Sequence, residues 1–132
     1  MKIAAITEDG KTISQHFGRA PYYLVVTLEN GQIVDRQMRD KLGHVHFANE
    51  PHARAEPGQL HGFDPASQNR HTLMAEAIAD CQALLCGGMG AGAYDSIRAR
   101  GIIPIVTDIH SIEEAVRRYS EGTIVDRVDR LH

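Results

Sequence analysis

Histidine is concentrated in one stretch of this chain, where it could bind a metal ion. Five of the eight histidines fall in a stretch that is also rich in proline and glycine: His44, His46, His52, His61 and His71. In an extended backbone His44 and His46 point to the same side, so one transition-metal ion could bind both imidazoles. Long loops in compact domains are usually functional or disordered. The sequence therefore predicts a histidine-rich loop at about residues 40–66, either a metal site or a hydrophilic loop whose histidines keep it soluble.

A second group of reactive side chains lies in residues 14–21, with the sequence Ser-Gln-His-Phe-Gly-Arg-Ala-Pro. Arg19 offers planar donors for a carboxylate or phosphate group, and Gly18 would let the backbone approach a ligand closely. His16 adds an imidazole next to them. The alternative is purely structural: Phe17 fills the core, Gly18 makes a turn and His16 caps a strand. This segment predicts an anion-binding turn or a packing turn.

A third candidate is the glycine-rich segment 86–93, which follows a predicted strand and opens a predicted helix. The amide groups at a helix N-terminus suit an anion. Gly88, Gly90 and Ala93 also satisfy the dinucleotide-binding pattern, and Asp108 lies where that pattern places a ribose-binding carboxylate. A nucleotide-binding regulatory domain is therefore an alternative function. A glycine-rich turn that serves only close packing is the other alternative.

Cys86 lies at the carboxyl end of its predicted strand, facing the crevice where open α/β sheets usually bind ligands. A thiolate there could bind iron or another soft metal. Free cysteine is also among the most frequently buried residue types, so a core position explains Cys86 equally well. Cys81 is expected in the core. The two cysteines do not imply a disulfide framework.

The elements that must position these residues follow from hydrophobic periodicity and turn signals. Strands are predicted at 2–7, 22–28, 33–38, 83–86 and 102–106. Asn30-Gly31 predicts a type I′ hairpin, and Pro104 predicts that the last strand lies at the sheet edge. Helices are predicted from about 66 or 69 to 80, over 90–100, and from a Ser111 cap to Tyr119, with Gly101 and Gly122 as stops.

This order of elements predicts the fold class. Strands joined through helices return parallel to each other, whereas the hairpin must be antiparallel. We therefore expect an α/β protein with three layers and a five-stranded mixed sheet. The length fits a single domain over 1–132.

Composition excludes several classes of function. The formal net charge is -3 and no cluster of basic residues occurs, which argues against nucleic acid as a partner. Glu8 and Asp9 interrupt the N-terminal apolar residues before a signal peptide could form, and no apolar run is long enough to cross a membrane. We expect a cytoplasmic protein without membrane contact. None of the common catalytic motifs is present, so we expect no enzyme.

Several of these features together resemble a known family, the dinitrogenase iron-molybdenum cofactor biosynthesis proteins. The resemblance covers nearly the whole domain. It rests on the opening Met1-Lys2-Ile3-Ala4, His16-Phe17-Gly18-Arg19-Ala20, the histidine-rich loop, the Gly88-x-Gly90 turn, Gly101-Ile102 and Tyr119-x-x-Gly122.

The resemblance implies a ribonuclease-H-like fold and a non-catalytic binding or carrier domain. The cargo would be an iron-sulfur or iron-molybdenum cluster or its precursor, and the partners would be metallocofactor assembly proteins. His16 matches a family position for a ligand or anchor, whereas Cys86 does not match one. The resemblance does not imply that this chain itself takes part in nitrogen fixation.

We therefore predict a crevice in which an anionic cluster lies between the His16 segment and the glycine-rich segment. The residues predicted to line it are His16, Phe17, Gly18, Arg19, Cys86, Gly88, Met89 and Gly90. His16, His44 and His46 are the predicted metal ligands. A single metal ion on the loop, in a metal-buffering protein, is a further alternative. The crevice requires that both segments lie at the same edge of the sheet.

Overall fold

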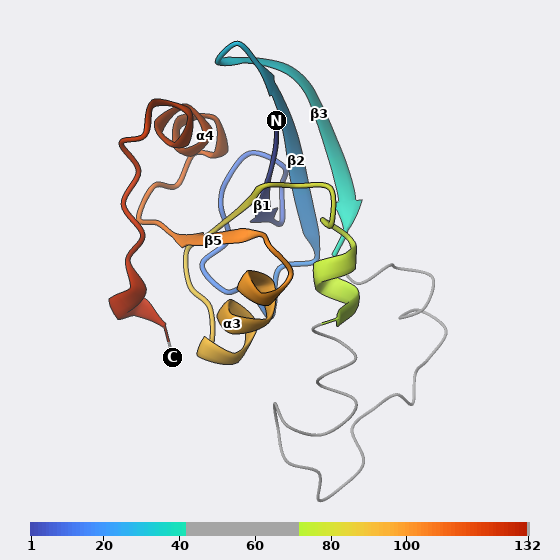
Figure 1. Ribbon diagram of the computed structural model, residues 1–132, viewed down its shortest axis with the longest axis vertical. Coiled ribbons are helices and arrows are strands. Elements are labelled where there is room, and N and C mark those ends of the chain that lie inside the picture. Colours follow the sequence, from blue (N-terminus) through green and yellow to red (C-terminus); the bar gives the residue numbers. More distant parts are fainter. Residues whose placement is uncertain (42–71, 132) are drawn as a thin grey trace, which may run out of the picture.

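A computed structural model of the chain describes residues 1–41 and 72–131 (Figure 1). It has five strands, β1 (Lys2–Thr7), β2 (Tyr22–Glu29), β3 (Gln32–Asp40), β4 (Ala83–Cys86) and β5 (Ile103–Val106). Its helical segments are a stretch at 72–76, α3 (Ala91–Ala99), α4 (Ile112–Glu121) and the 3-10 turn η1 (Val128–Arg130). No helix of the described residues is long and apolar enough to cross a membrane.

The strands form one mixed sheet in the order β3-β2-β1-β4-β5. β1 pairs antiparallel with β2 and parallel with β4, and β5 continues the parallel part. The predicted five-stranded mixed sheet is thus confirmed. β5 is an edge strand, as Pro104 predicts, because the proline cannot donate to a further strand. The ribonuclease-H-like label stays a prediction.

The hairpin between β2 and β3 forms at the predicted residues. Asn30 and Gly31 have φ angles of 54° and 79°, the positive values that a type I′ turn requires. The pairing of the two strands shifts register between Thr27 and Leu28 of β2, before the turn. After the turn, β3 continues to Asp40. The hairpin is therefore longer than the predicted strands, because the added residues Arg39 and Asp40 are charged and continue no hydrophobic alternation.

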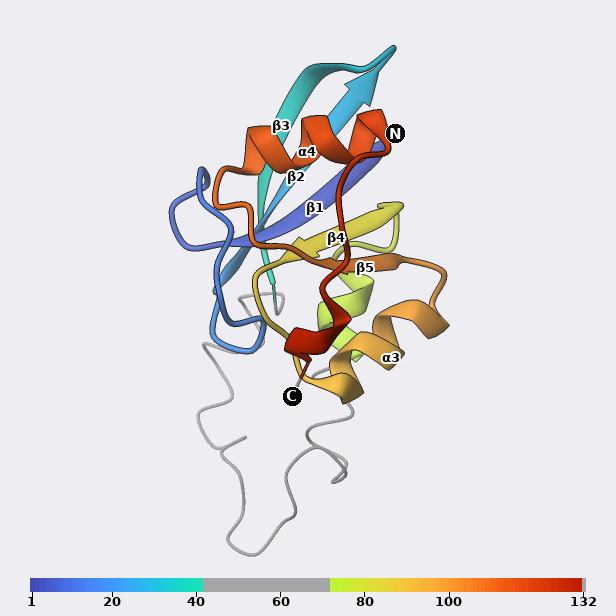
Figure 2. The ribbon, with the colours of Figure 1, turned by 90° about the vertical axis from the view of Figure 1, so that its left-hand side faces the viewer.

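Helices cover both faces of the sheet, which gives the predicted three layers (Figures 1 and 2). Tyr23 and Leu24 of β2 identify what covers each face, because the side chains of adjacent strand residues point to opposite faces. The Tyr23 hydroxyl donates to the Met74 carbonyl at 2.8 Å, so one face lies against the stretch 72–76. Leu24 lines a hollow together with Ile112 of α4, which covers the other face.

The two later helices form where the sequence predicts, and α4 continues to Glu121, two residues past the predicted end. Gly101 and Gly122 have φ angles of 82° and 75°, which allows each to end the helix before it. The Ser111 hydroxyl accepts a hydrogen bond from the Glu114 amide at 3.2 Å and caps α4. The Glu114 carboxylate pairs with two arginines of its own helix, so the observed contact is the serine half of the predicted capping box.

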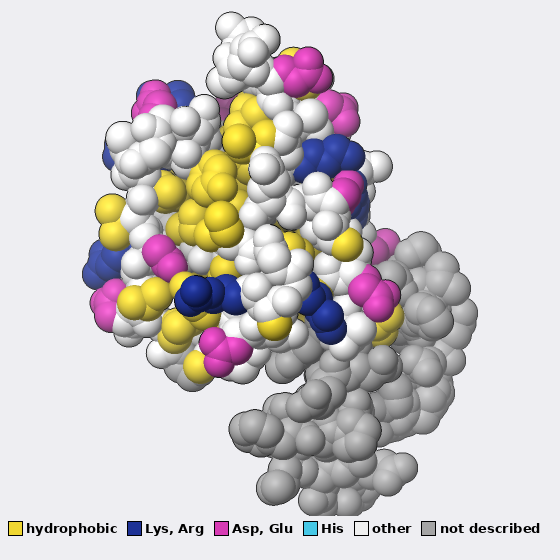
Figure 3. All heavy atoms as spheres, viewed as in Figure 1, with side chains coloured by type: hydrophobic (Ala, Val, Ile, Leu, Met, Phe, Trp, Pro, Cys, Tyr) yellow, Lys and Arg dark blue, Asp and Glu magenta, His cyan; other side chains and the backbone are white. Residues whose placement is uncertain are grey.

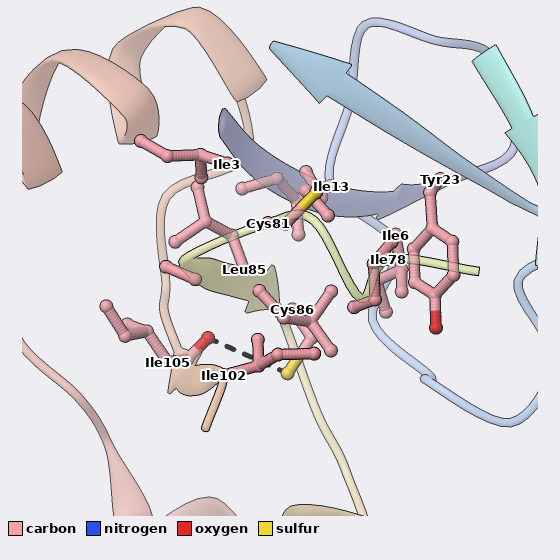
Figure 4. Packing of buried hydrophobic residues seen from close by; sticks show 14 of the residues in the cluster. Ile3, Ile6, Ile13, Tyr23, Ile78, Cys81, Leu85, Cys86, Ile102 and Ile105 are labelled. Carbon is pink, nitrogen blue, oxygen red and sulfur yellow. Dashed lines mark hydrogen bonds between the residues drawn. The ribbon is translucent and has the colours of Figure 1, made fainter. Parts of the chain in front are cut away.

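The core fills the space on both sides of the central strands β1 and β4, whose residues are almost all buried (Figure 4). Isoleucines from β1, β5 and the surrounding segments contact Leu85 and Cys86 of β4. On the face shown in Figure 3, apolar side chains also reach the surface between α4 and β5. Buried strands with apolar residues on both faces are typical of a parallel sheet covered on both sides.

Candidate functional site

Two backbone hydrogen bonds join the predicted site segments. The Gly87 amide donates to the Ser14 carbonyl at 2.9 Å, and the Phe17 amide donates to the Gly88 carbonyl at 3.0 Å. Residues 14–20, here called the His16 turn, therefore lie directly against residues 87–90, here called the glycine turn. Both lie beside the carboxyl end of β4. The two segments thus lie at the same edge of the sheet, as the prediction requires, and the crevice itself stays a prediction.

Close contact between the two turns explains why residue 87 is glycine. A Cβ atom at this position would lie 2.7 Å from the Gln15 side-chain nitrogen and 2.9 Å from the Ser14 carbonyl oxygen. The carbonyl belongs to the backbone and is already held by the Gly87 amide. Any side chain at 87 would therefore push the two turns apart.

The His16 turn divides its side chains between core and surface. Phe17 is 4% exposed and packs into the core, as the structural alternative predicts. His16, Gly18 and Arg19 are exposed. The His16 carbonyl accepts from the amides of Arg19 and Ala20, each at 3.2 Å, which closes the turn. An imidazole and a guanidinium group thus lie on the surface next to the glycine turn, and their binding roles stay predictions.

Cys86 lies in the core, at the end of β4. Its side chain is fully buried, and its sulfur atom is 3.7 Å from the Ile105 carbonyl oxygen (Figure 4). Burial raises the pKa of the thiol to about 12. The thiol is therefore protonated at neutral pH in this arrangement, whereas a metal ligand must be a thiolate. The predicted ligand role of Cys86 would require this burial to be relieved.

The glycine turn leads directly into α3. Met89 is 1% exposed, and its backbone forms a parallel bridge with Leu131. Gly90 is the N-cap of α3 and has no side chain with which to cap the first turn. The first amides of a helix point out of its N-terminus without a helical partner and attract anions. Gly88, Met89 and Gly90 thus lead into the N-terminus of α3, and the Met89 side chain among them is buried.

Lys41 also belongs to this region, although sequence reasoning missed it. Its side chain is fully buried, and its Nζ donates a hydrogen bond to the Phe17 carbonyl. The Nζ also lies 4.4 Å from the centre of the Phe17 ring. Burial lowers the pKa of the ammonium group to about 8. Lysine is rarely buried and follows an exposed strand here, so no sequence signal marks it.

The other two predicted metal ligands belong to the histidine-rich loop. His44 and His46 lie outside the described residues, as does nearly all of the predicted histidine-rich loop. Within residues 1–41 and 72–131, no three side chains of histidine, cysteine, aspartate or glutamate come together in a way that could hold a metal ion. A metal ion bound by His16 would therefore need its other ligands from the cluster itself or from other residues of the chain.

Asp108, the key residue of the nucleotide-binding alternative, is exposed and forms an ion pair with Arg127. Arg127 also pairs with Asp129 and donates its amide to the Val106 carbonyl at 2.7 Å. The carboxylate thus already has a cationic partner on the surface.

The family follows from comparison with known proteins. The family model described as "dinitrogenase iron-molybdenum cofactor" matches residues 1–122. The chain belongs to this family. The predicted resemblance is confirmed, and the match ends with Gly122, the residue that closes α4. Nothing in the comparisons supports the nucleotide-binding alternative.

Individual relatives share the whole domain at low identity. An uncharacterized protein of Methanocaldococcus jannaschii is 27% identical over 126 residues, covering 94% of this chain and 89% of that protein. The apo form of the orange protein from Desulfovibrio gigas is 23% identical, with a TM-score of 0.63 and coverage of 93% and 89%. A second M. jannaschii protein, provisionally described as a dinitrogenase, is 14% identical, with a TM-score of 0.60 and coverage of 94% and 91%. The solved structures show that the fold is shared.

Proposed function

We propose that this chain is a non-catalytic binding or carrier domain in metallocofactor assembly. Its cargo would be an iron-sulfur or iron-molybdenum cluster, or a precursor of one, and it would exchange that cargo with assembly proteins. Family membership supports the class of cargo. The absence of a common catalytic motif from the sequence supports a role without catalysis.

The observation that carries the proposal is the contact between the His16 turn and the glycine turn. It brings three kinds of anion-binding group to one end of the sheet. These are the exposed imidazole of His16, the exposed guanidinium of Arg19 and the N-terminal amides of α3. Metal-sulfur clusters are commonly anionic, and imidazole is a ligand for iron.

The mixed order of the sheet also supports the ribonuclease-H-like assignment as part of this proposal. β1, β4 and β5 run parallel, so their carboxyl ends meet at one edge. Open α/β sheets bind ligands outside these ends. The proposed cargo site occupies this position.

The proposal is tested by anaerobic mixing of the purified protein with isolated iron-molybdenum cofactor. After gel filtration, absorption spectra and metal analysis would be compared for the wild type, His16→Ala and a His44→Ala/His46→Ala double variant. We expect the wild type to retain the cluster and His16→Ala to lose most of it. Negligible, equal retention by all three proteins would refute the proposal.

A parallel titration with Zn²⁺ separates this function from metal buffering by the histidine-rich loop. Metal buffering predicts that Zn²⁺ binds in the wild type and in His16→Ala alike, and is lost in the double histidine variant. Cluster retention that is likewise indifferent to His16 would favour metal buffering over a cluster carrier.

A further inference from the structure

The ammonium group of Lys41 is a buried positive charge on the core side of the His16 turn, next to the proposed cargo site. Lys41 follows β3, and its backbone amide donates to the Pro21 carbonyl at 3.0 Å, which fixes the residue at the end of the His16 turn. Its fully buried Nζ donates to the Phe17 carbonyl. The Phe17 amide in turn donates to Gly88 of the glycine turn. One residue thus links the lysine to both turns.

Among the described residues, this positive charge has little compensation. Within residues 1–41 and 72–131, no carboxylate forms an ion pair with the Lys41 ammonium. Its contacts are a neutral carbonyl and the face of the Phe17 ring, 4.4 Å away. The neighbouring Cys86 thiol is protonated at neutral pH and provides no negative charge.

An unpaired buried charge is costly, and proteins usually remove it or pair it. The pKa of Lys41 is lowered by burial, but only to about 8, so the group is still mostly protonated at neutral pH. The rest of the site is also cationic on its exposed side, where Arg19 lies. Residues 1–41 and 72–131 thus provide no paired carboxylate for Lys41, and an anionic ligand bound at the two turns would supply a counter-charge.

We infer that Lys41 is a positioning residue that provides the internal positive charge for an anionic cluster bound on the surface where the His16 turn meets the glycine turn. This inference rests on the proposed function. Lys41 acts without touching the cluster, through an interior in which charges interact more strongly than in water. It selects for anionic cargo and disfavours bare metal cations at the same place.

The test compares two neutral variants, Lys41→Met and Lys41→Gln, with the wild type. Methionine replaces the charge with an apolar chain of similar length, and glutamine keeps an N–H donor for the Phe17 carbonyl. Lys11→Met makes the same chemical change at an exposed lysine and is the matched control. Binding of isolated iron-molybdenum cofactor would be titrated anaerobically, Zn²⁺ binding would be titrated separately, and urea unfolding would report the stability of each apo protein.

We expect both neutral variants to bind the cluster at least about tenfold more weakly, because one unit of charge is lost in a poorly screened position. Zn²⁺ binding should be unchanged or tighter. The apo form of Lys41→Gln should be no less stable than the wild type, because a buried charge is gone while a donor for the Phe17 carbonyl is kept. A structural role alone would instead lower stability, and the affinities for the cluster and Zn²⁺ would fall together. If Lys41→Met does not fold, Lys41→Gln provides the same comparison.

The failures of the two proposals differ in this experiment. A wild type that retains no cluster refutes the proposed function itself. A wild type that binds the cluster with the same affinity as both neutral variants refutes only the role of Lys41. Parallel loss of cluster and Zn²⁺ binding in the neutral variants also overturns it, since lost charge alone cannot weaken cation binding.

Discussion

At the scale of single residues, two glycines of the proposed site have opposite roles. Gly87 is required by the contact between the turns, because a Cβ atom would lie 2.9 Å from the Ser14 carbonyl oxygen. A Cβ atom at Gly18 would meet no atom within 4 Å. The sequence alone does not distinguish them, since both belong to short glycine-containing turns. The three-dimensional contact decides which one a side chain would disrupt.

We predict that Gly87→Ala destabilises the protein by about 2 kcal/mol or more, because the new methyl group must displace backbone that is hydrogen-bonded. Gly18→Ala should change the free energy of unfolding by less than about 0.5 kcal/mol or stabilise slightly. Urea denaturation of both variants measures the difference. Equal stability of the two variants would mean that the turns can separate without cost.

At the scale of elements, ion pairs that differ in hydrogen bonding and exposure connect the strands to the rest of the fold. Asp80, which precedes β4, accepts from Arg39 of β3 at 2.7 and 2.9 Å and from Lys2 of β1 at 3.1 Å. These contacts hold the pKa of the Asp80 carboxyl well below its usual range, the Arg39 hydrogen bonds contributing most. The pair of Arg36 with Glu113 of α4 is more exposed, the glutamate side chain being 65% exposed.

Asp80→Asn should therefore lower the free energy of unfolding by about 1 kcal/mol at pH 7, a modest value because the Asp80 side chain is 45% exposed. A depressed pKa in the folded state stabilises the protein above the unfolded-state pKa of about 4, and this contribution is lost as the pH falls further. The difference between variant and wild type should thus shrink below pH of about 4.

Urea denaturation from pH 7 down to pH 2 measures this difference. Glu113→Gln provides the matched control and should stay close to the wild type throughout. An Asp80→Asn effect that is constant with pH would show that the carboxylate charge is not its cause.

A second contact between elements protects the edge of the sheet. Asp126, beyond the end of the family match, accepts from the Val106 amide of β5 at 2.9 Å and from the Tyr94 hydroxyl of α3 at 2.8 Å. Arg127 then donates its amide to the Val106 carbonyl. The segment after α4 thus satisfies backbone groups of β5 that an edge strand leaves unpaired.

We expect Asp126→Ala to cost about 1–3 kcal/mol in unfolding free energy, because the buried Val106 amide loses its acceptor. Tyr94→Phe removes only the hydroxyl contact and should cost less, on the order of 1 kcal/mol. Chemical denaturation with both variants tests the ranking. A Tyr94→Phe effect equal to that of Asp126→Ala would assign the stabilisation to the tyrosine contact instead of the strand edge.

At the scale of the whole molecule, the parts that the sequence predicts are those with local signals. Asn30-Gly31, the Ser111 cap and the glycines after each helix determine element ends through their own backbone preferences. The meeting of the His16 turn with the glycine turn is also predictable, because carboxyl ends of parallel strands share an edge. The burial of Lys41 is different, since it depends on contacts between segments distant in the sequence.

The same long-range contacts make a whole-molecule prediction about the loaded protein. A cluster bound on the surface where the two turns meet would bind the folded chain alone, because the unfolded chain no longer brings residues 14–20 and 87–90 together. A ligand that binds only the folded state stabilises it by about 2.7 kcal/mol at a free concentration of one hundred times Kd. Anaerobic loading with isolated iron-molybdenum cofactor should therefore raise the Tm of the wild type by several degrees, on the order expected for a domain of this size.

His16→Ala is the control for this measurement and should show little or no increase in Tm under the same loading. Gly87→Ala, which separates the turns, should also lose most of the increase, although His16 itself is unchanged. If the wild type retains the cluster and its Tm does not rise, the cluster binds the folded and the unfolded chain equally well. The junction of the two turns would then not be the binding site, because binding to a folded site necessarily stabilises it.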